Sequence, residues 1–378
     1  MPEFRLPQVI HFGWGALEKL RDEAPLLGRR ALLVTGRSAM KRSGAADRVI
    51  ALLSGAGVDA VTFDEVESDP STSIIDRGAA RAKGEKCDLV IGLGGGSPMD
   101  SARAIAGLVG LGGSILDYVR GKPIDRPGLP LINIATTSGT ASEITHVAVA
   151  LDEERQIKIG MRSAFWFARA AITDPELTVT MPPAITAGTG LDALTHAAES
   201  YMSTGATPPS EALALRAITL VGEHLRAAVA DGSDRPAREG MAMASMIAGM
   251  AFANTGLGLA HGIAHPVGAR YHLAHGACCG KLLPYVMRHN AAVVPERVAA
   301  IGAALTGGPM RDPDAAAAAV ERLTRDVGVQ SGLADVGIPA SEIATLAKDT
   351  LLVGAIRTNP RPVGEEDARA VLEAATRV

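Results

Sequence analysis

The stretch DLVIGLGGGSPMDSARAIAGL, residues 88–108, decides the fold of this chain. Its first six residues are largely apolar, which is typical of a strand buried on both faces of a parallel sheet. Three glycines follow, and apolar residues then recur at helical spacing. A buried strand, a glycine-rich turn and a helix in immediate succession indicate a strand–helix unit of an α/β nucleotide-binding fold.

The glycine-rich turn is suited to a pyrophosphate. Glycines 94–96 let the backbone turn sharply and approach a ligand without interference from a Cβ atom. We predict Ser97 as the helix N-cap, Pro98 as the first helical residue and Asp100 as the acid of a capping box. Free N–H groups and the helix dipole then point at one spot. The spacing is neither GxGxxG nor a Walker loop, so this turn alone also fits a tight connection that binds nothing.

The same alternation continues on both sides of this stretch. We predict further strands at 31–36, 58–63, 129–136 and 168–174, helices at 45–53, 74–82 and 97–108, and a hairpin within 146–161. This order predicts a parallel sheet covered by helices on both faces. A second polar turn, TTSGT at 136–140, also follows a strand. Because parallel sheets bind ligands at the carboxyl ends of their strands, two such turns favour a nucleotide.

The residue pattern of the sequence changes after Asp174-Pro175, from alternating strands and helices to helices alone. The segment MPPAIT at 181–186 is typical of a hinge, and Ala/Leu/Met-rich patterns at helical spacing follow it to Val378. We therefore predict an α/β dinucleotide-binding domain at 1–181 and an all-helical metal- and substrate-binding domain at 182–378. A chain of 378 residues is long enough for two such cores.

Charge and cysteine content exclude several classes of function. The net charge is −4 and no stripe of Lys or Arg occurs, so we expect neither a nucleic-acid nor a membrane partner. We find no secretory signal and no run of 18 apolar residues. The three cysteines, Cys87, Cys278 and Cys279, include no CxxC motif. This usage fits the reducing cytoplasm and argues against a metal site bound by cysteine.

Histidines carry the strongest chemical signal in the helical half. Four of the nine lie close together, at positions 261, 265, 272 and 275. Upstream, Asp192 and His196 are four residues apart and would share one helix face. One carboxylate and several imidazoles, without a thiolate, suit Fe(II), Zn, Mn or Co. Taken singly, each residue is more often structural, and spacing alone does not choose among the four histidines.

The chain resembles the iron-containing (group III) alcohol dehydrogenases over nearly its full length. The matching segments are GGGSPMDSA (94–102), TTSGTASEIT (136–145), DPELT (174–178), TAGTGLDALTHAAESY (186–201), FANTGLGLAHGIAHPVGARYHLAHG (252–276) and TNPRP (358–362). The resemblance implies an enzyme that interconverts an alcohol and an aldehyde or ketone, using NAD(P)(H) and Fe²⁺, with Zn²⁺ as the alternative metal. It also implies a small neutral substrate and a homo-oligomer, a dimer or larger.

The resemblance implies a set of site residues. The implied metal ligands are Asp192, His196, His261 and His275, with His265 one turn past His261 as a catalytic residue that relays a proton. The implied cofactor residues are Gly36, Asp69, Gly95, Gly96, Ser97, Thr136, Thr137, Lys158 and Leu177. Phe252 matches an aromatic residue that lines the pocket.

Two rival functions remain open from the sequence. The chain is more weakly similar to the dehydroquinate synthases, which share this architecture, NAD and a metal but are lyases. Those enzymes need several basic residues around a phosphorylated substrate, whereas here chiefly Arg270 and Lys281 lie near the histidines. The second rival is a protein that binds a metal or a nucleotide without catalysis. It leaves unexplained why a nucleotide turn and a metal site occur in one chain.

Three positions depart from the resembling family. Arg103 stands where the family often has lysine, and the segment 164–175 has Arg169 and a Phe/Trp cluster where a proline is usual; we predict a packing role for that segment. After the first predicted strand the chain reads Gly36-Arg37-Ser38, without the acid that repels a 2′-phosphate in NAD-preferring members. Arg37 can pair with a phosphate, whereas Asp69 offers a carboxylate for the ribose. We predict that NADP(H) is accepted at least as well as NAD(H).

Overall fold

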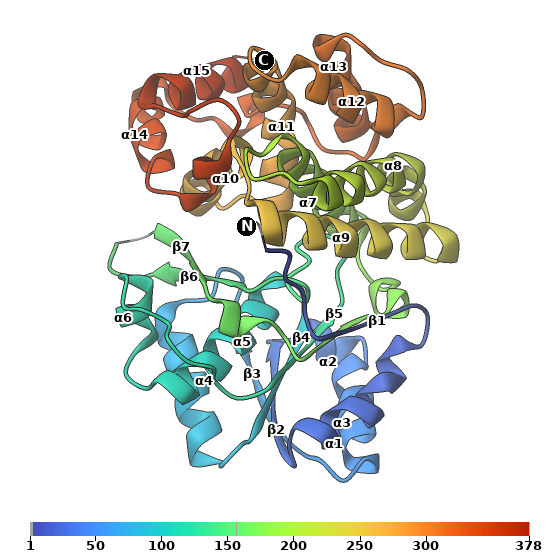
Figure 1. Cartoon of the computed structure of the whole chain (residues 1–378), viewed down its shortest axis with the longest axis vertical. Coiled ribbons are helices and arrows are strands. Elements are labelled where there is room, and N and C mark those ends of the chain that lie inside the picture. The colour runs from blue at the N-terminus through green and yellow to red at the C-terminus, as the bar shows by residue number, and fades with distance from the viewer. Residues whose placement is uncertain (1–2, 156, 378) are drawn as a thin grey trace. The chain divides into compact units, whose positions relative to one another are not determined.

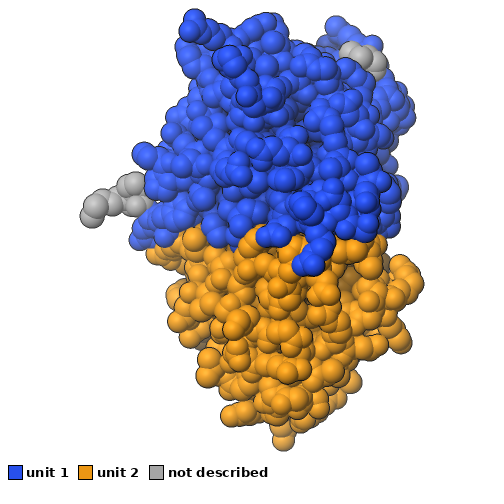
Figure 2. Space-filling view, turned by 90° about the vertical axis from the view of Figure 1, so that its right-hand side faces the viewer, with its two compact units in different colours: residues 1–4, 138–140, 181–378 blue, residues 5–137, 141–180 orange. Residues whose placement is uncertain are grey.

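The computed structural model describes residues 3–155 and 157–377, which form two compact units (Figure 2). The sheet unit comprises Arg5–Thr137 and Ala141–Thr180. The helical unit comprises the described residues from Met181 onward, together with Ser138–Thr140 and residues 3–4. The assignment of Ser138–Thr140 departs from the predicted division at 181, because Gly139 lies directly against the backbone of Thr189, where an added Cβ would be 2.6 Å from the Thr189 carbonyl oxygen.

The sheet unit is built on six parallel strands in the order β1-β8-β5-β4-β2-β3. Their bounds are Val9–Phe12 (β1), Arg30–Gly36 (β2), Asp59–Val66 (β3), Leu89–Gly94 (β4), Leu131–Ala135 (β5) and Ala170–Thr173 (β8). The predicted hairpin is the antiparallel pair Val147–Asp152 (β6) and Ile157–Arg162 (β7). The sequence analysis missed β1, an edge strand whose four residues are all partly exposed and show no buried run.

Helices cover both faces of this sheet (Figure 1). They are Leu20–Leu27 (α1), Ala39–Arg42 (α2), Ala45–Gly55 (α3), Thr72–Gly84 (α4), Gly96–Leu111 (α5) and Ile115–Val119 (α6). Successive residues of β4 point to opposite faces: Val90 belongs to the core beneath α4 and α5, whereas Leu89 and Ile91 belong to the core beneath α1 and α3. The near-continuous apolar strands of the sequence are thus explained by burial on both faces.

The start of α5 differs from the prediction. The helix begins at Gly96 with Gly95 as its N-cap, so Ser97 is a residue of the first turn and makes no cap. Asp100 forms no capping box. Its carboxylate instead accepts hydrogen bonds from Arg103 (3.0 Å), from the Ser142 hydroxyl (2.5 Å) and from the Val149 N–H (3.0 Å). The reason is that the helix starts two residues earlier than predicted, so Pro98 is its third residue rather than its first, and Asp100 is its fifth, beyond the third position that a capping box requires.

Arg103 joins four segments of the sheet unit. Its guanidinium is 1 % exposed and donates to Asp100, to the Ser142 hydroxyl and carbonyl, and to the Val147 carbonyl. Its Nε also donates to the Trp166 carbonyl at 3.1 Å. Trp166 is itself buried, and its indole fills the space above Gly107. This contact gives the aromatic segment at 164–175 a packing role.

The helical unit contains no strand among its described residues. Its helices are Pro183–Met202 (α7), Pro208–Ala230 (α8), Arg235–Thr255 (α9), Leu259–Tyr271 (α10), His275–Ala291 (α11), Pro295–Thr306 (α12), Pro313–Asp326 (α13), Ala340–Thr350 (α14) and Glu365–Thr376 (α15). In the part of the chain that the structure describes, no single helix has the length and apolar character of a membrane span. The pair α9 and α10, bent by 104°, passes that test only when taken together.

Arg103→Lys should destabilise the protein by about 1–3 kcal/mol, because an ammonium cannot reproduce the fork of donors and leaves buried acceptors unpaired. Arg126→Lys is the matched control, since Arg126 pairs with Asp125 on the surface and the change should cost less than about 0.5 kcal/mol. Urea unfolding of both variants measures the difference. Equal free energies of unfolding for the two variants would show that the guanidinium donors of Arg103 contribute nothing to stability.

Candidate metal centre and cofactor turn

The close approach of two helices places the first pair of predicted ligands. Helix α11 begins at His275, and the next residue, Gly276, lies against α7. A Cβ atom on Gly276 would overlap the carbonyl oxygen of Gly188 and would lie 2.7 Å from the Cβ of Asp192. Only glycine therefore lets α11 start at this point, and His275 comes to lie beside Asp192.

A buried carboxylate positions the third helix. Glu199, on α7, accepts hydrogen bonds from the N–H groups of Gly258 (2.9 Å) and Ala260 (2.6 Å), at the start of α10. Asn359, in the TNPRP motif, accepts from the Leu259 N–H at 3.2 Å. These acceptors satisfy the free donors at the helix N-terminus, where negative charge is favourable. His261, in the first turn of α10, is fixed by these contacts.

Three histidine nitrogens surround one oxygen of Asp192. The distances from Asp192 Oδ1 are 3.6 Å to His261 Nε2, 3.9 Å to His275 Nε2 and 4.0 Å to His196 Nε2. Asp192 Oδ1 and His261 Nε2 are buried and have no hydrogen-bond partner among the described residues. Leaving such atoms unsatisfied is costly. A divalent cation between them would satisfy both, so these residues fit a metal.

Hydrogen bonds on the far side of the rings fix the tautomers. His261 Nδ1 lies 2.6 Å from Glu199 Oε2, and His196 Nδ1 lies 3.2 Å from the Gly139 carbonyl oxygen. Both partners are acceptors, so each Nδ1 carries a proton, and each Nε2 is the nitrogen left to bind a cation beside Asp192. Glu199 was missed in the sequence analysis. The signal was present, since residues 192, 196 and 199 follow the i, i+4, i+7 spacing of one helix face.

The electrostatics of the cluster favour a bound cation. Burial opposes ionisation of Asp192, but His196, His261 and His275 outweigh it and hold the pKa of this carboxyl below its usual range. Burial lowers the pKa of His196 to about 3, so this ring is neutral, as a metal ligand must be. Burial also opposes charging of His261, yet Cys279, Glu199 and Asp192 raise its pKa well above the ordinary value. Positive charge is therefore stabilised at the centre of the group.

A cysteine belongs to the same cluster. Single ligand atoms of Asp192, His261, His275 and Cys279 all lie within 4.8 Å of one another, and Cys279 Sγ is 3.8 Å from His275 Nε2. The structure thus brings a sulfur atom close to the predicted ligands, which the sequence analysis did not expect. Cysteine spacing gave no CxxC, but Cys279 follows His275 by four residues and so shares its face of α11. His196 is not among these four and lies beside them.

The remaining predicted side chains of the helical unit lie around this cluster. The ring of His265 is tilted against that of His275, with centroids 5.3 Å apart. Phe252 stacks on His196 at 4.2 Å, so this aromatic side chain contacts a predicted ligand directly. His272 ends α10 in a left-handed conformation, with φ of 55°, which makes it the C-cap of the helix.

In the sheet unit, the predicted cofactor residues lie at carboxyl ends of strands. Strand β3 is added on one side of β2 and β4 on the other, so the order of the parallel strands reverses between β2 and β4. Gly36 ends β2, Gly95 and Gly96 follow β4, and the Thr136 N–H donates to the Gly94 carbonyl at 2.9 Å. Such a reversal is where open α/β sheets bind nucleotides. The arrangement matches the predicted phosphate-binding turn.

The two polar turns leave space and an unpaired hydroxyl for a ligand. A Cβ atom on Gly95 would lie 3.3 Å from the Thr137 side chain, so glycine keeps this approach open. The Thr137 hydroxyl is buried and has no partner among the described residues. Ser97 lies in the first turn of α5, and Leu177 lies on the 3₁₀ turn Pro175–Thr178, which follows β8. These features fit a dinucleotide.

The charged side chains of the predicted cofactor site are already paired with one another or with a neighbour, in two ion pairs. Lys158 Nζ lies 2.7 Å from Asp69 Oδ2, and the Lys158 side chain is only 8 % exposed. Asp69 adopts a left-handed conformation with φ of 57°. Arg37 lies 2.6 Å from Glu67 Oε1, with both side chains more than half exposed. An exposed pair of this kind contributes little energy, so a phosphate can compete for Arg37.

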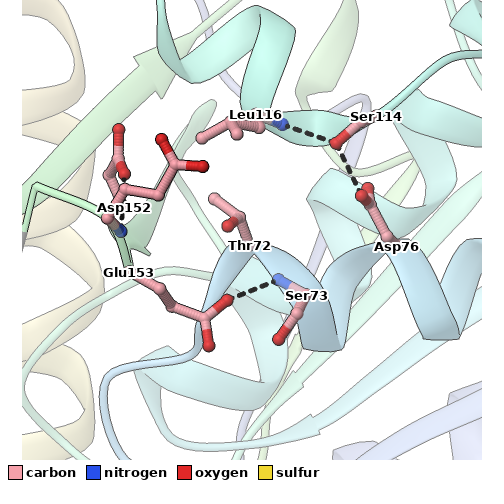
Figure 3. A pocket seen from close by; sticks show the side chains of 8 residues that line it. Thr72, Ser73, Asp76, Ser114, Leu116, Asp152 and Glu153 are labelled. Atoms are coloured by element: carbon pink, nitrogen blue, oxygen red, sulfur yellow. Dashed lines mark hydrogen bonds between the residues drawn. The ribbon is translucent and has the colours of Figure 1, made fainter.

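A pocket elsewhere in the sheet unit contains none of the predicted site residues. Figure 3 shows it between α4, α6 and the end of β6; it is lined by Thr72, Ser73, Asp76, Ser114, Leu116, Asp152, Glu153 and Glu154. Carboxylates of this pocket accept hydrogen bonds from other segments of the same chain. Asp76 accepts from the Ser114 hydroxyl at 2.6 Å and from the Ile115 N–H at 2.7 Å. Arg120 pairs with Asp152 at 3.2 Å. These contacts are structural and join α4 to α6 and the hairpin.

Comparison with known proteins covers both units. The model of the iron-containing alcohol dehydrogenases matches residues 7–175, and the model of the C-terminal part of the Fe-containing alcohol dehydrogenase family matches residues 186–376. Long-chain-alcohol dehydrogenase 1 of Geobacillus thermodenitrificans is 40 % identical over 98 % of this chain and 95 % of that protein. The NAD-dependent methanol dehydrogenase of Bacillus methanolicus is 36 % identical over 99 % of both chains. The crystal structure of a 1,3-propanediol oxidoreductase, 37 % identical, superposes with a TM-score of 0.95 over 99 % of this chain and all of the other.

Glu199→Gln should weaken metal binding roughly 10- to 100-fold, because a neutral amide no longer makes the His261 ring a stronger base. The measurement is metal retained by the folded variant during titration with a chelator. Glu211→Gln is the matched control, since Glu211, on α8, pairs with Arg297 on α12. Unchanged retention in Glu199→Gln would show that this carboxylate supports only the start of α10.

Proposed function

This chain belongs to the iron-containing alcohol dehydrogenase family, and from that premise we propose that its helical unit binds iron(II) through Asp192, His196, His261 and His275. The enzyme is a metal-dependent oxidoreductase that interconverts an alcohol and an aldehyde or ketone by hydride transfer with NAD(H). Zinc is the alternative metal for the same ligands. A single observation supports the proposal best: Asp192 Oδ1 and His261 Nε2 are buried, 3.6 Å apart and unpaired.

The residues of the cluster would perform distinct tasks. When bound, the metal supplies Lewis-acid polarisation of the substrate oxygen, and the nicotinamide accepts or donates the hydride. Asp192 supplies the one negative charge of the proposed ligand set. Glu199 holds the His261 ring in the tautomer that leaves Nε2 unprotonated. We assign to His265, one turn past His261, the movement of the substrate proton toward solvent.

In the sheet unit, we propose that the turn at 94–97 and the hydroxyls of Thr136 and Thr137 bind the pyrophosphate. The unpaired Thr137 hydroxyl and the open approach at Gly95 support this role. Asp69 would bind a ribose hydroxyl, with Lys158 beside it. Gly36 and Leu177 would line the path of the adenosine and the nicotinamide.

The charges near the histidines favour a neutral substrate. Arg270 pairs with Glu342 at 2.8 Å and with Asp349 at 2.9 Å, and Lys281 pairs with Asp335 at 2.8 Å. Both basic groups are thus already neutralised by carboxylates. This arrangement disfavours the dehydroquinate synthase type of lyase, whose substrate is strongly anionic. We propose small alcohols as substrates, in keeping with relatives named for methanol and 1,3-propanediol.

We further infer that the protein works in the reducing cytoplasm as a homo-oligomer. Its three cysteines are buried and free, which supports the first inference. For the cofactor, we propose that NADP(H) is used at least as well as NAD(H). Gly36 has no side chain to exclude a 2′-phosphate, and Arg37 is held only by an exposed ion pair with Glu67.

His261→Ala should remove most of the bound metal and nearly all alcohol oxidation while the protein stays folded, because the weakened ligand set no longer retains the cation. His265→Ala is the matched variant, one turn further along α10, and should keep the metal while turnover slows. Metal analysis of both purified proteins, with turnover read from nicotinamide absorbance, tests this pair. One equivalent of metal in His261→Ala would remove it from the ligand set, and metal loss in His265→Ala would make that residue a ligand.

Gly36→Asp should lower kcat/KM for NADP(H) at least about tenfold, or about 1.4 kcal/mol, relative to NAD(H), because a carboxylate would face the 2′-phosphate. The side chain fits, since a Cβ there lies 3.6 Å from its nearest neighbour, the Val66 carbonyl oxygen. Gly36→Asn has the same shape without the charge and should retain NADP(H) use. A wild type that strongly prefers NAD(H), together with no effect of Gly36→Asp, would show that this turn does not contact the ribose.

A further inference from the structure

The polar turn at 136–140 contains atoms that belong to both proposed binding sites. The Thr137 hydroxyl, which we assigned to the pyrophosphate, is buried and has no hydrogen-bond partner among the described residues. The Gly139 carbonyl oxygen lies 3.2 Å from Nδ1 of His196, a proposed metal ligand. Thr137 and Gly139 are two residues apart, so at most about 7 Å of chain joins them. A change at one site therefore has a short covalent path to the other.

Gly139 is packed tightly against the helix that carries two of the proposed ligands. A Cβ atom there would lie 2.6 Å from the carbonyl oxygen of Thr189 and 2.8 Å from its Cα atom. The φ of Gly139 is not left-handed, so the close approach alone excludes a side chain. Thr189 precedes Asp192 by three residues on α7. Because Gly139 contacts backbone, no side-chain rotation can absorb a displacement of the turn.

We propose that Gly139 is a positioning residue that links the two sites, so that a nucleotide bound at Thr137 strengthens metal retention and the metal strengthens nucleotide binding. This inference rests on the proposed metal and cofactor sites and adds an energetic linkage between them. The linkage acts through the Gly139 carbonyl, which accepts the Nδ1 proton of His196 and so orients the ring with Nε2 toward Asp192.

The linkage follows because each ligand orders the same short segment. A phosphate on the Thr137 hydroxyl fixes the backbone two residues before Gly139. A cation on Nε2 of His196 fixes the ring that donates to the Gly139 carbonyl. The ligand that binds second meets a segment that is already ordered, and it therefore loses less conformational entropy. Thermodynamic reciprocity requires that each ligand improve the affinity of the other by the same factor.

Calorimetric titration of the metal-free and the zinc-saturated full chain with ADP-ribose measures the coupling. ADP-ribose contains the pyrophosphate but lacks the nicotinamide, so a direct contact between the nicotinamide and the metal cannot contribute. Zinc is the probe because it does not change its oxidation state. The wild type should bind ADP-ribose at least about fivefold more tightly when zinc is bound. ADP-ribose should protect the bound zinc against a chelator by the same factor.

Gly139→Ala should bring the two dissociation constants for ADP-ribose close together, because its methyl group displaces the turn from α7 and breaks the contact with His196. Gly84→Ala is the matched control, since a Cβ atom there meets nothing within 4 Å. Glu199→Gln is a second control, since it weakens the metal site through His261 and should keep the wild-type ratio. If Gly139→Ala does not fold, Thr137→Val keeps the side-chain shape and should also lower the ratio.

The outcomes separate the linkage from the proposed sites. Equal dissociation constants in the wild type with and without zinc would overturn the linkage and leave both sites in place. A wild-type ratio that persists in folded Gly139→Ala, or in Thr137→Val, would overturn the path through this turn. Failure of zinc or of ADP-ribose to bind the wild type would overturn that proposed site and the linkage with it. Loss of the ratio in Gly139→Ala, with the ratio kept in both controls, supports the proposal.

Discussion

The structure of the helical unit depends on one buried negative charge that protein groups alone leave unsatisfied. Asp192 Oδ1 is surrounded by three imidazole nitrogens but accepts no hydrogen bond within the described chain. Holding it there requires that α11 start directly against α7, which Gly276 permits, and that α10 start at the carboxylate of Glu199. Folding brings these groups together at a cost that a cation offsets.

In the sheet unit, the constraint is that both faces of the sheet are covered, and a buried charged group again connects distant segments. Its parallel strands are buried on both faces, so only their carboxyl ends can present polar groups to a ligand. Arg103, buried in the helix that follows the glycine-rich turn, joins that helix to the backbone of three other segments and to Asp100. The helix is therefore anchored by a buried group, while glycine at position 95 keeps the approach toward Thr137 open.

Two further features distinguish the helical unit: its basic residues near the histidines are paired with carboxylates, and a thiol lies next to the histidine cluster. Arg270 and Lys281 are each paired with carboxylates, so neither of them is a free cation for an anionic substrate. Cys279 places a sulfur atom beside a group that otherwise offers nitrogen and oxygen. The paired basic residues and the thiol thus lie outside the aspartate and histidines of the recognisable motif.

The sequence by itself determined the alternating strands and helices of the first half, the helical second half and the family, and it predicted Asp192, His261 and His275 of the four clustered side chains, the fourth being Cys279. These follow from local periodicity and from short motifs, which one segment of chain contains in full. The roles of Glu199 and Asp100 and the place of Cys279 were decided by tertiary structure, because each depends on a partner from a distant segment: His261 for Glu199, Ser142 for Asp100, and Asp192 for Cys279. Helical spacing placed each side chain on a face, but only packing determines what that face meets.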